Sequence, residues 1–120
     1  MTRDELIHYI RENYRCDVDY PWEKYPDYLV IRRRDNKKWF AGIFAVNAHQ
    51  LGIDSNDRLD VVNLKCDVDL IPAFLRESHI YPAYHMNKRH WISVDIERYA
   101  NTETLNILVD MSYRLVGKVR

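Results

Sequence analysis

The amino-acid sequence predicts an α+β fold, and three patterns carry this prediction. Apolar residues at helical spacing open and close the chain, and apolar or alternating runs typical of β-strands lie between them. A further helical segment precedes the last of these strands. Because helices grouped around a mainly antiparallel sheet define this class, we expect an antiparallel sheet of about four to five strands with N- and C-terminal helices and one inserted helix.

Length and composition are those of one domain, expected over residues 1–120. Hydrophobic residues make up 47% of the 120, which supplies a core and excludes the disordered class. The 18 basic and 18 acidic side chains cancel, which argues against a globally basic nucleic-acid binder. No run approaches the roughly 18 apolar residues of a membrane span, and the N-terminus lacks the apolar region of a signal peptide. We therefore expect a cytoplasmic protein without membrane contact.

The first helix has a clear start signal, and both terminal helices have an apolar face. Thr2 and Glu5 have the spacing of a capping box, and Leu6 and Ile10 follow on one face of a helix expected to end near Arg15. The last helix is expected over residues 101–117. Its buried stripe should consist of Leu105, Leu108, Val109, Ser112, Leu115 and Val116.

The middle of the chain reads as strands around one helix. Segments 28–33 and 39–46 should form a hairpin about the polar turn 35–38, and strands at 59–66 and 90–96 follow. Segment 17–22 is a candidate short edge strand limited by Pro21. Segments 47–58 and 80–84 should be loops. Asp67 or Asp69 should cap the inserted helix, which runs to about Ser78 with Pro72 in its early turns.

No motif for catalysis, a cofactor or a metal is present. The sequence has no Gly-x-Ser-x-Gly and no glycine-rich nucleotide loop, so it names no reaction, and we expect neither an enzyme nor a cofactor. An enzyme with His85 or His90 as its general base is a further alternative, for which no partner carboxylate is identifiable. His85 and His90 are five residues apart, which places them on opposite faces of an extended segment, and no third ligand lies near them. Cys16 and Cys66 lack the close spacing of a metal or redox pair and should be free thiols.

Segment 84–91, Tyr-His-Met-Asn-Lys-Arg-His-Trp, is the most distinctive in the chain. It is too polar to be buried as a whole, and an anion-recognition loop is one interpretation. Lys88 and Arg89 would supply charge, while His85 and Asn87 would supply hydrogen bonds. Trp91 would offer a stacking face. A polar turn that leads into a strand, with Trp91 covering the sheet, explains the same residues.

A second basic group lies at the predicted hairpin tip. Its members are Arg32, Arg33, Arg34, Lys37 and Lys38. Contact with phosphates is one interpretation of this local excess of positive charge. A charged tip that prevents edge-to-edge pairing of sheets is the other, and it explains the sequence equally well.

Strand alternation adds Lys65 to the candidate residues. Val62 and Ile92 should lie on the face covered by the helices, whereas Lys65 lies on the opposite face of its strand. If strands 59–66 and 90–96 are neighbours, Lys65 approaches Trp91 on a partly open face that Trp39 shares. This face would be a binding surface, unless its aromatic side chains pack among themselves.

The chain resembles the MmcQ/YjbR family over nearly its whole length. The resemblance is carried by Lys-Cys-Asp at 65–67, by His-Met-Asn-Lys-Arg-His-Trp at 85–91 and by Ser-Tyr-Arg-Leu-Val at 112–116. It implies a CyaY-like α+β fold. It also implies a DNA-binding role, by analogy with the double-wing arrangement of a phage transcription factor domain. Val68 stands where the family commonly has proline. The first helix lacks the acidic ridge of CyaY-like proteins, so iron binding is not expected.

Two hypotheses follow. In the first, double-stranded DNA is the partner, and Asn87 and Trp91 lie near its bases or sugars. The phosphates would be met by Arg32, Arg33, Arg34, Lys37, Lys38, Lys88 and Arg89.

In the second hypothesis, a small anionic ligand or a partner protein occupies a pocket lined by Lys65, His85, Asn87, Lys88 and Trp91. A concave pocket holding Lys65 and Trp91 together favours the second hypothesis, and a flat or saddle-shaped surface favours the first. A monomer is expected, and a dimer through an exposed strand edge stays open.

Overall fold

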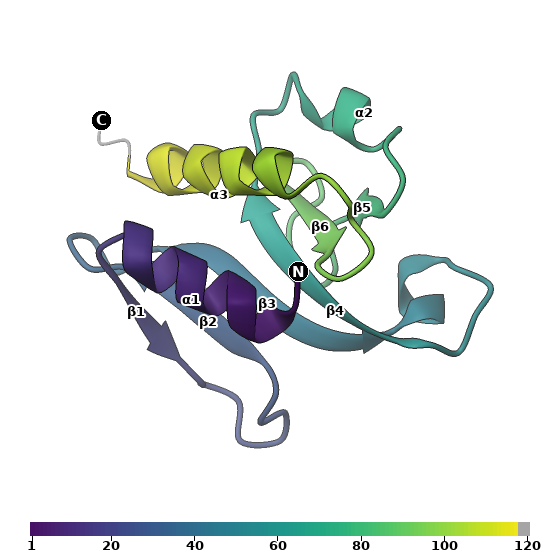
Figure 1. Ribbon diagram of the computed structural model, residues 1–120, viewed down its shortest axis with the longest axis horizontal. Coiled ribbons are helices and arrows are strands. Elements are labelled where there is room, and N and C mark those ends of the chain that lie inside the picture. Colours follow the sequence, from purple (N-terminus) through teal and green to yellow (C-terminus); the bar gives the residue numbers. More distant parts are fainter. Residues whose placement is uncertain (118–120) are drawn as a thin grey trace.

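The computed structural model describes residues 1–117 and contains a six-stranded antiparallel sheet with two long helices on one face (Figure 1). The sheet order is β1-β2-β3-β4-β6-β5. The strands are β1 (Cys16–Asp19), β2 (Leu29–Arg33), β3 (Trp39–Asn47), β4 (Arg58–Lys65), β5 (Ile80–Pro82) and β6 (Trp91–Asp95). The helices are α1 (Arg3–Asn13), α2 (Ile71–Phe74) and α3 (Thr102–Val116), with a 3-10 helix η1 (Ala48–Leu51). The expected α+β class is confirmed.

The sheet has six strands rather than four to five, because both of its edges are short strands. β1 occupies part of the candidate edge segment and pairs with β2. β5 lies where a loop was expected, and that expectation was wrong. Ile80 pairs with Val94 and Pro82 with Ile92, so this proline sits on an outer strand, where the N–H it lacks is not required by a second neighbour.

The inserted helix is a single turn and not the longer helix expected over residues 67–78. The Oδ1 atom of Asp67 accepts a hydrogen bond from the N–H of Asp69, which forms a turn before the helix instead of a cap. Pro72 lies in the first turn, as expected. Beyond Phe74 the N–H of Arg76 bonds back three residues to Ala73, so the chain continues as turns.

The terminal helices form as the sequence predicts. The capping box of Thr2 and Glu5 is present at α1, and the Asn101 side chain caps α3. α1 ends at Asn13, short of Arg15, because the chain enters β1 at Cys16. Leu115 is half-buried, whereas the rest of the expected stripe of α3 is buried. Within residues 1–117, no helix combines the length and apolar character needed to cross a membrane.

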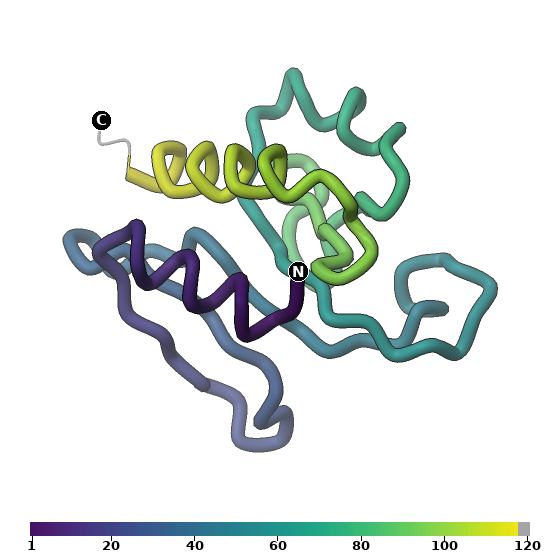
Figure 2. The backbone as a smooth tube through the Cα atoms, viewed as in Figure 1, coloured from purple at the N-terminus to yellow at the C-terminus, as the bar shows by residue number. Residues whose placement is uncertain are grey.

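The two faces of the sheet are covered differently. The face under α1 and α3 is an aliphatic core that includes Leu6, Ile10, Leu29, Ile31, Phe40, Ile43, Val62, Leu64, Ile92, Val94, Leu105 and Leu108. Both cysteines are buried free thiols, as expected, and burial raises the pKa of Cys66 to about 11. The opposite face, here called the open face, has no helix of this length and is covered by loops. The tube in Figure 2 shows how α3 ends close to the β2–β3 hairpin, where the Asn36 side chain bonds to the carbonyl of Val116.

Candidate functional site

The two basic segments predicted from the sequence lie at the same end of the sheet, here called the basic end. The β2–β3 turn lies at this end, just before β3 begins. Ala41 near the start of β3 pairs with Leu64 near the end of β4, and Lys65 pairs with Trp91 at the start of β6. The end of β4 and the start of β6 therefore lie beside the turn. The N–H of Cys66 donates to the carbonyl of His90 at 2.8 Å, which brings segment 85–91 to the same place. Since neighbouring strands lie about 4.8 Å apart, the hairpin and β6 are separated by roughly 10–15 Å.

The arginines of the hairpin have partners within the protein. Arg32 forms an ion pair with Asp19, and Arg34 lies 3.5 Å from Asp17. Both acids come from β1, which pairs with β2 along the edge of the sheet. The Arg32 guanidinium also lies 5.5 Å from the ring centroid of Trp39. Acidic side chains thus offset charge that the sequence alone left free for phosphates.

Arg33 points to the other face and holds the hairpin to α3. Its guanidinium lies 3.8 Å from the ring centroid of Tyr113 and donates to that residue's carbonyl at 2.7 Å. It also pairs with Asp35 at 2.8 Å, and this contact raises the pKa of Arg33 and lowers the pKa of Asp35. With its side chain only 14% exposed, Arg33 has a structural role.

The other cations of the candidate set make no ion pair with any residue from 1 to 117. They are Lys37, Lys38, Lys65, Lys88 and Arg89, and all but the half-buried Lys65 are exposed. Each of the two segments contains a non-glycine residue with positive φ, Lys37 at 64° in the β2–β3 turn and His85 at 55° in the loop before β6. Both segments therefore include a tight turn. Positive charge available to a ligand is therefore concentrated on lysines and Arg89.

Asn87 shapes the loop that precedes β6. Its Oδ1 atom accepts from the N–H of Arg89, and its carbonyl accepts from the N–H groups of His90 and Trp91. Trp91 is half-buried beside Lys65. Trp39 packs on Trp22 with ring centroids 5.8 Å apart, so part of the aromatic face does pack on itself. In the described part of the chain, no three His, Cys, Asp or Glu side chains come together to hold a metal ion.

An aromatic cluster covers the centre of the open face. Phe44 on β3 packs against the rings of Trp22, Tyr28 and Tyr84 at centroid distances of 5.8, 5.0 and 6.0 Å. The hydroxyls of Tyr28 and Tyr84 lie 3.2 Å apart. Burial and this hydrogen bond raise the pKa of Tyr84 to about 12. The cluster joins loop 20–28 to loop 83–90 across the sheet.

Two adjoining hollows open beside this cluster. One of about 360 Å³ is lined by Trp22, Tyr25, Tyr28, Gln50, Tyr84 and His85. The other, of about 490 Å³, shares Gln50, Tyr84 and His85 and adds Leu51, Pro82, Ala83 and Lys88. Neither hollow is lined by Lys65 or Trp91, the pair that the sequence suggested for a pocket.

Buried polar side chains fix the loop that forms one wall of these hollows. The amide of Asn63 donates to the carbonyl of Tyr84 at 2.6 Å, and its oxygen accepts from the hydroxyl of Ser93. The N–H of Tyr84 donates to the same hydroxyl at 2.8 Å. Asn63 and Ser93 are fully buried, so β4 and β6 hold loop 83–90 through satisfied hydrogen bonds.

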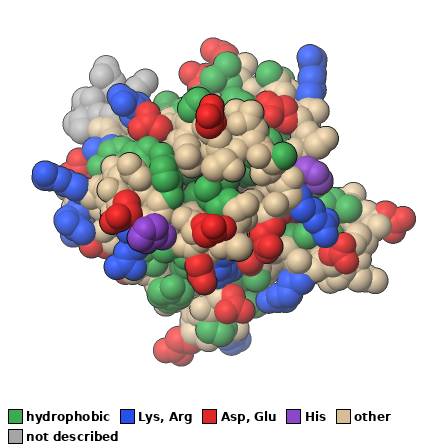
Figure 3. Space-filling model, in the orientation of Figure 1, with side chains coloured by type: hydrophobic (Ala, Val, Ile, Leu, Met, Phe, Trp, Pro, Cys, Tyr) green, Lys and Arg blue, Asp and Glu red, His purple; other side chains and the backbone are tan. Residues whose placement is uncertain are grey.

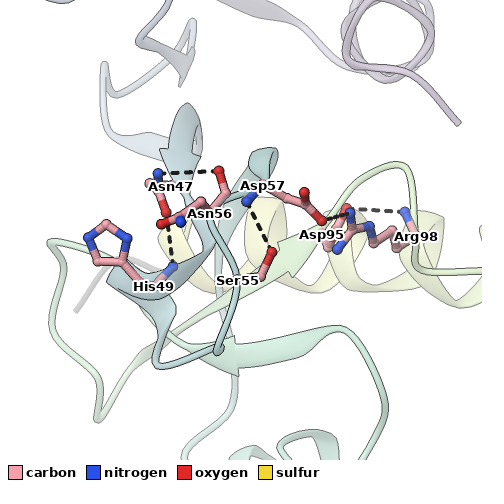
Figure 4. A network of polar contacts seen from close by, with 7 residues as sticks. All are labelled: Asn47, His49, Ser55, Asn56, Asp57, Asp95 and Arg98. Carbon is pink, nitrogen blue, oxygen red and sulfur yellow. Dashed lines mark hydrogen bonds and ion pairs between the residues drawn. The ribbon is translucent and has the colours of Figure 1, made fainter.

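The opposite wall is fixed by η1 and the loop that follows it (Figure 4). Gln50 and Asn47 form a capping box, in which the Asn47 N–H donates to the Gln50 side chain at 2.9 Å. Arg98 bonds to Asp57 at 3.0 Å and lies 3.8 Å from the buried Asp95 at the end of β6. The Arg98 contact lowers the pKa of Asp57. The Gln50 side chain also bonds to the Tyr84 hydroxyl, which links this wall to loop 83–90.

The residues that sequence reasoning missed are Trp22, Tyr25, Tyr28 and Gln50. A signal for the first three was present, because aromatic residues recur every two or three positions along segment 20–28. Gln50 had no local signal, since only the folding of η1 over the sheet brings it to the hollows.

The face in Figure 3, on the helix side, shows acidic and basic side chains interspersed.

Comparison with known proteins gives one family and several close relatives. The model of the family described as YjbR matches residues 11–115. The uncharacterised protein YyaQ of Bacillus subtilis is 37% identical over 115 residues, which are 96% of this chain and 98% of that protein. A crystal structure of a Pseudomonas syringae protein shares 39% identity at a TM-score of 0.92, covering 96% of this chain and 98% of that one. A Deinococcus radiodurans protein, 24% identical with a TM-score of 0.75, covers 98% of this chain and 79% of its own, and shares the fold.

Proposed function

This chain belongs to the YjbR family, and we propose that it binds nucleic acid, with double-stranded DNA as the partner, through the basic end of its sheet. The observation that carries the proposal is the strand register. It gathers cations that make no ion pair within residues 1–117 at one end of the sheet, from the β2–β3 turn, the end of β4 and the loop before β6. A neutral chain can bind a polyanion when its free positive charge is gathered in this way.

The spacing of these segments suits a phosphate backbone. The hairpin and β6 are separated by roughly 10–15 Å, and a duplex presents one negative charge per about 1.7 Å of its axis. A stretch of that length therefore offers roughly six to nine phosphates. This number is enough for each of the five cations without an ion pair in residues 1–117 to contact a phosphate. Arg32 and Arg34 would keep their ion pairs with Asp19 and Asp17. Because these contacts are to phosphates, they carry no sequence preference.

The test is a salt titration of binding to a labelled DNA duplex, followed by fluorescence anisotropy. Lys37, Lys38, Lys65, Lys88 and Arg89 are the cations expected to meet phosphates. Five contacts predict a slope of log K against log salt near roughly −4.5. Each of the variants Lys38→Glu and Lys65→Glu should weaken binding and make the slope shallower by about 1.

Arg58→Glu provides a matched control for Lys65→Glu. Both residues lie on β4, Arg58 at its first position and Lys65 at its last, at opposite ends of the sheet. Arg58 is 70% exposed and makes only a 3.9 Å contact with Asp27, so its loss should leave the fold intact. If Arg58→Glu weakens binding as much as Lys65→Glu does, the attraction is general and the basic end is not the site. A slope near zero for the unaltered protein would contradict nucleic-acid binding itself.

A small anionic ligand is the second candidate function. The observation in its favour is the pair of hollows on the open face, where His85 and Lys88 lie beside the aromatic cluster. The two candidate functions place the ligand at different sites. A small ligand would occupy the hollows and would not contact Lys38 at the basic end. Binding of a small ligand would show little change on Lys38→Glu.

A further inference from the structure

We propose that the two adjoining hollows on the open face bind one nucleotide unit, with its base against the aromatic side chains and its phosphate beside Lys88. The smaller hollow is walled mainly by rings, and the larger one carries the cation. They share Gln50, Tyr84 and His85, so a single ligand can reach from one into the other. The proposal rests on the second candidate function, the binding of a small anionic ligand in these hollows. Of the cations proposed to meet DNA at the basic end, only Lys88 lines the hollows.

The aromatic wall favours a planar ligand. Tyr25 stacks on Tyr28 with ring centroids 4.7 Å apart and an angle of 13° between the ring planes. Trp22 meets Tyr28 edge-on at 5.9 Å. Tyr25 is 52% exposed, so part of its ring is free to contact a ligand. A nucleobase would extend such a stack, because every base has a π-face and stacking tolerates any base.

The charges around the hollows favour an anion over a cation. Aromatic walls also bind quaternary ammonium groups, which are attracted to the faces of the rings. Here the lining includes no Asp or Glu, and Lys88 and His85 border the space. Lys88 is exposed and has no ion-pair partner in residues 1–117, so it is free to contact a phosphate. A planar cation would meet the positive charge of Lys88, whereas a nucleotide combines a flat ring with negative charge.

Gln50 supplies a polar group at the boundary of the two hollows. Its side-chain oxygen accepts the N–H of Asn47, and this bond orients the amide. The Gln50 side chain also bonds to the Tyr84 hydroxyl, and the second N–H of its amide remains a donor that can reach an acceptor on a base or a sugar. Its bonds to Asn47 and Tyr84 hold this donor in position before the ligand arrives. Such preorganisation lowers the cost of ordering the site on binding.

The same chemistry has two sources, a free mononucleotide and an unpaired nucleotide within a strand. The probes are therefore adenosine 5′-monophosphate and a short single-stranded oligothymidylate, each titrated by calorimetry. Ribose 5-phosphate, which has the phosphate without a base, is the third arm. Tighter binding of the mononucleotide assigns the free ligand, and binding of the oligonucleotide alone assigns the strand. Either result supports the site, provided that the binding is weakened by variants of the residues that line the hollows.

Dependence on the hollow is measured with two variants and their matched controls. Tyr25→Ala should weaken binding by roughly tenfold, in line with the loss of one stacking partner, and Lys88→Ala should weaken it as well. Tyr20→Ala removes another tyrosine of the same loop, 60% exposed and outside the hollows, and should have no effect. Arg89→Ala removes the neighbouring cation and should likewise leave mononucleotide binding unchanged.

Three results would overturn the proposal. They are binding of ribose 5-phosphate as tight as that of the mononucleotide, equal effects of Tyr25→Ala and Tyr20→Ala, and no binding of either nucleotide probe at millimolar concentration. Lys38→Glu separates this site from the basic end, since it should leave mononucleotide binding unaltered. A protein that binds duplex DNA but fails these tests would retain the function proposed above and lose only the nucleotide site.

Discussion

The two faces of the sheet are closed by different means, and the difference separates stability from binding. Under α1 and α3, aliphatic side chains fill the space, and most of them are completely inaccessible to solvent. On the open face, two loops approach each other through aromatic rings, hydroxyl groups and buried amides. Filled aliphatic cores do not open without unfolding, whereas loops held by a few hydrogen bonds can open locally. The candidate nucleotide site lies on the face built in the second way.

The largest effect should come from emptying the helix-covered face. Phe40 is fully buried between the sheet and α3, with its ring edge-on to Tyr113 at 4.9 Å and 5.9 Å from Tyr14. Phe40→Ala should lower the free energy of unfolding by about 3–5 kcal/mol, because a cavity remains where the ring was. Urea denaturation followed by circular dichroism measures this loss.

Tyr25→Ala is the corresponding truncation on the open face. Its ring is half-exposed, so the expected loss is below about 1 kcal/mol. An equal decrease in the free energy of unfolding for Phe40→Ala and Tyr25→Ala would mean that both faces act as one core. The two faces would then not differ in their contribution to stability.

An intermediate effect is expected where each face uses a buried polar side chain. Asn63 holds loop 83–90 through Tyr84 and Ser93. On the other face, the Ser112 hydroxyl of α3 donates to the carbonyl of Phe40 at 2.6 Å and accepts from the N–H of Lys65 at 2.8 Å. Asn63→Ala and Ser112→Ala should each cost about 1–3 kcal/mol, because each leaves buried partners unsatisfied.

Hydrogen exchange distinguishes the two losses. Asn63→Ala should speed exchange of the Tyr84 amide while the amides of β3 stay protected. Ser112→Ala should leave loop 83–90 as protected as before, because α3 does not contact it through this hydroxyl. Faster exchange throughout the sheet in Asn63→Ala would show that the loop is not a separate unit of stability.

The fold was largely readable from the sequence, because its strongest elements carry local signals. Capping by Thr2 and Glu5, the apolar face of α3 and the hairpin pattern all appear in the chain and in the structure. The failures lie where tertiary contacts decide. β5 has three residues and exists through its pairing with β6, and α2 is cut short by the turn that Asp67 forms. Such short elements have little propensity of their own.

The candidate site was harder to predict, since it depends on which charges find partners. Five basic residues of the hairpin look alike in sequence, yet the register pairs β1 with β2 and offers Asp17 and Asp19 to two of the arginines. The expected approach of Lys65 to Trp91 is present as a direct cross-strand pair. The hollows lie elsewhere, because they form only when η1, loop 20–28 and loop 83–90 fold over the same face.

A small effect at neutral pH, of the order expected for Tyr25→Ala, should come from removing the hydroxyl that joins the two loops. Tyr84→Phe keeps the ring against Phe44 and removes the bonds of the hydroxyl to Tyr28 and Gln50, both at a half-open surface, so the loss should be about 1 kcal/mol or less. The alkaline range is more informative. In the folded protein the pKa of Tyr84 is about 12, above its ordinary value of 10.0, because burial and the Tyr28 hydroxyl disfavour the phenolate.

A raised pKa makes this part of the stability fully present below pH 10, and it is lost as pH rises through about 12, because the unfolded chain releases the proton more easily. The unaltered protein should therefore lose stability more steeply between these values than Tyr84→Phe does. Tyr99, whose pKa is also raised to about 12, remains in both proteins, so it contributes equally to each curve. Parallel curves would mean that the Tyr84 hydroxyl already meets water, and that the open face is looser at its centre than its hydrogen bonds imply.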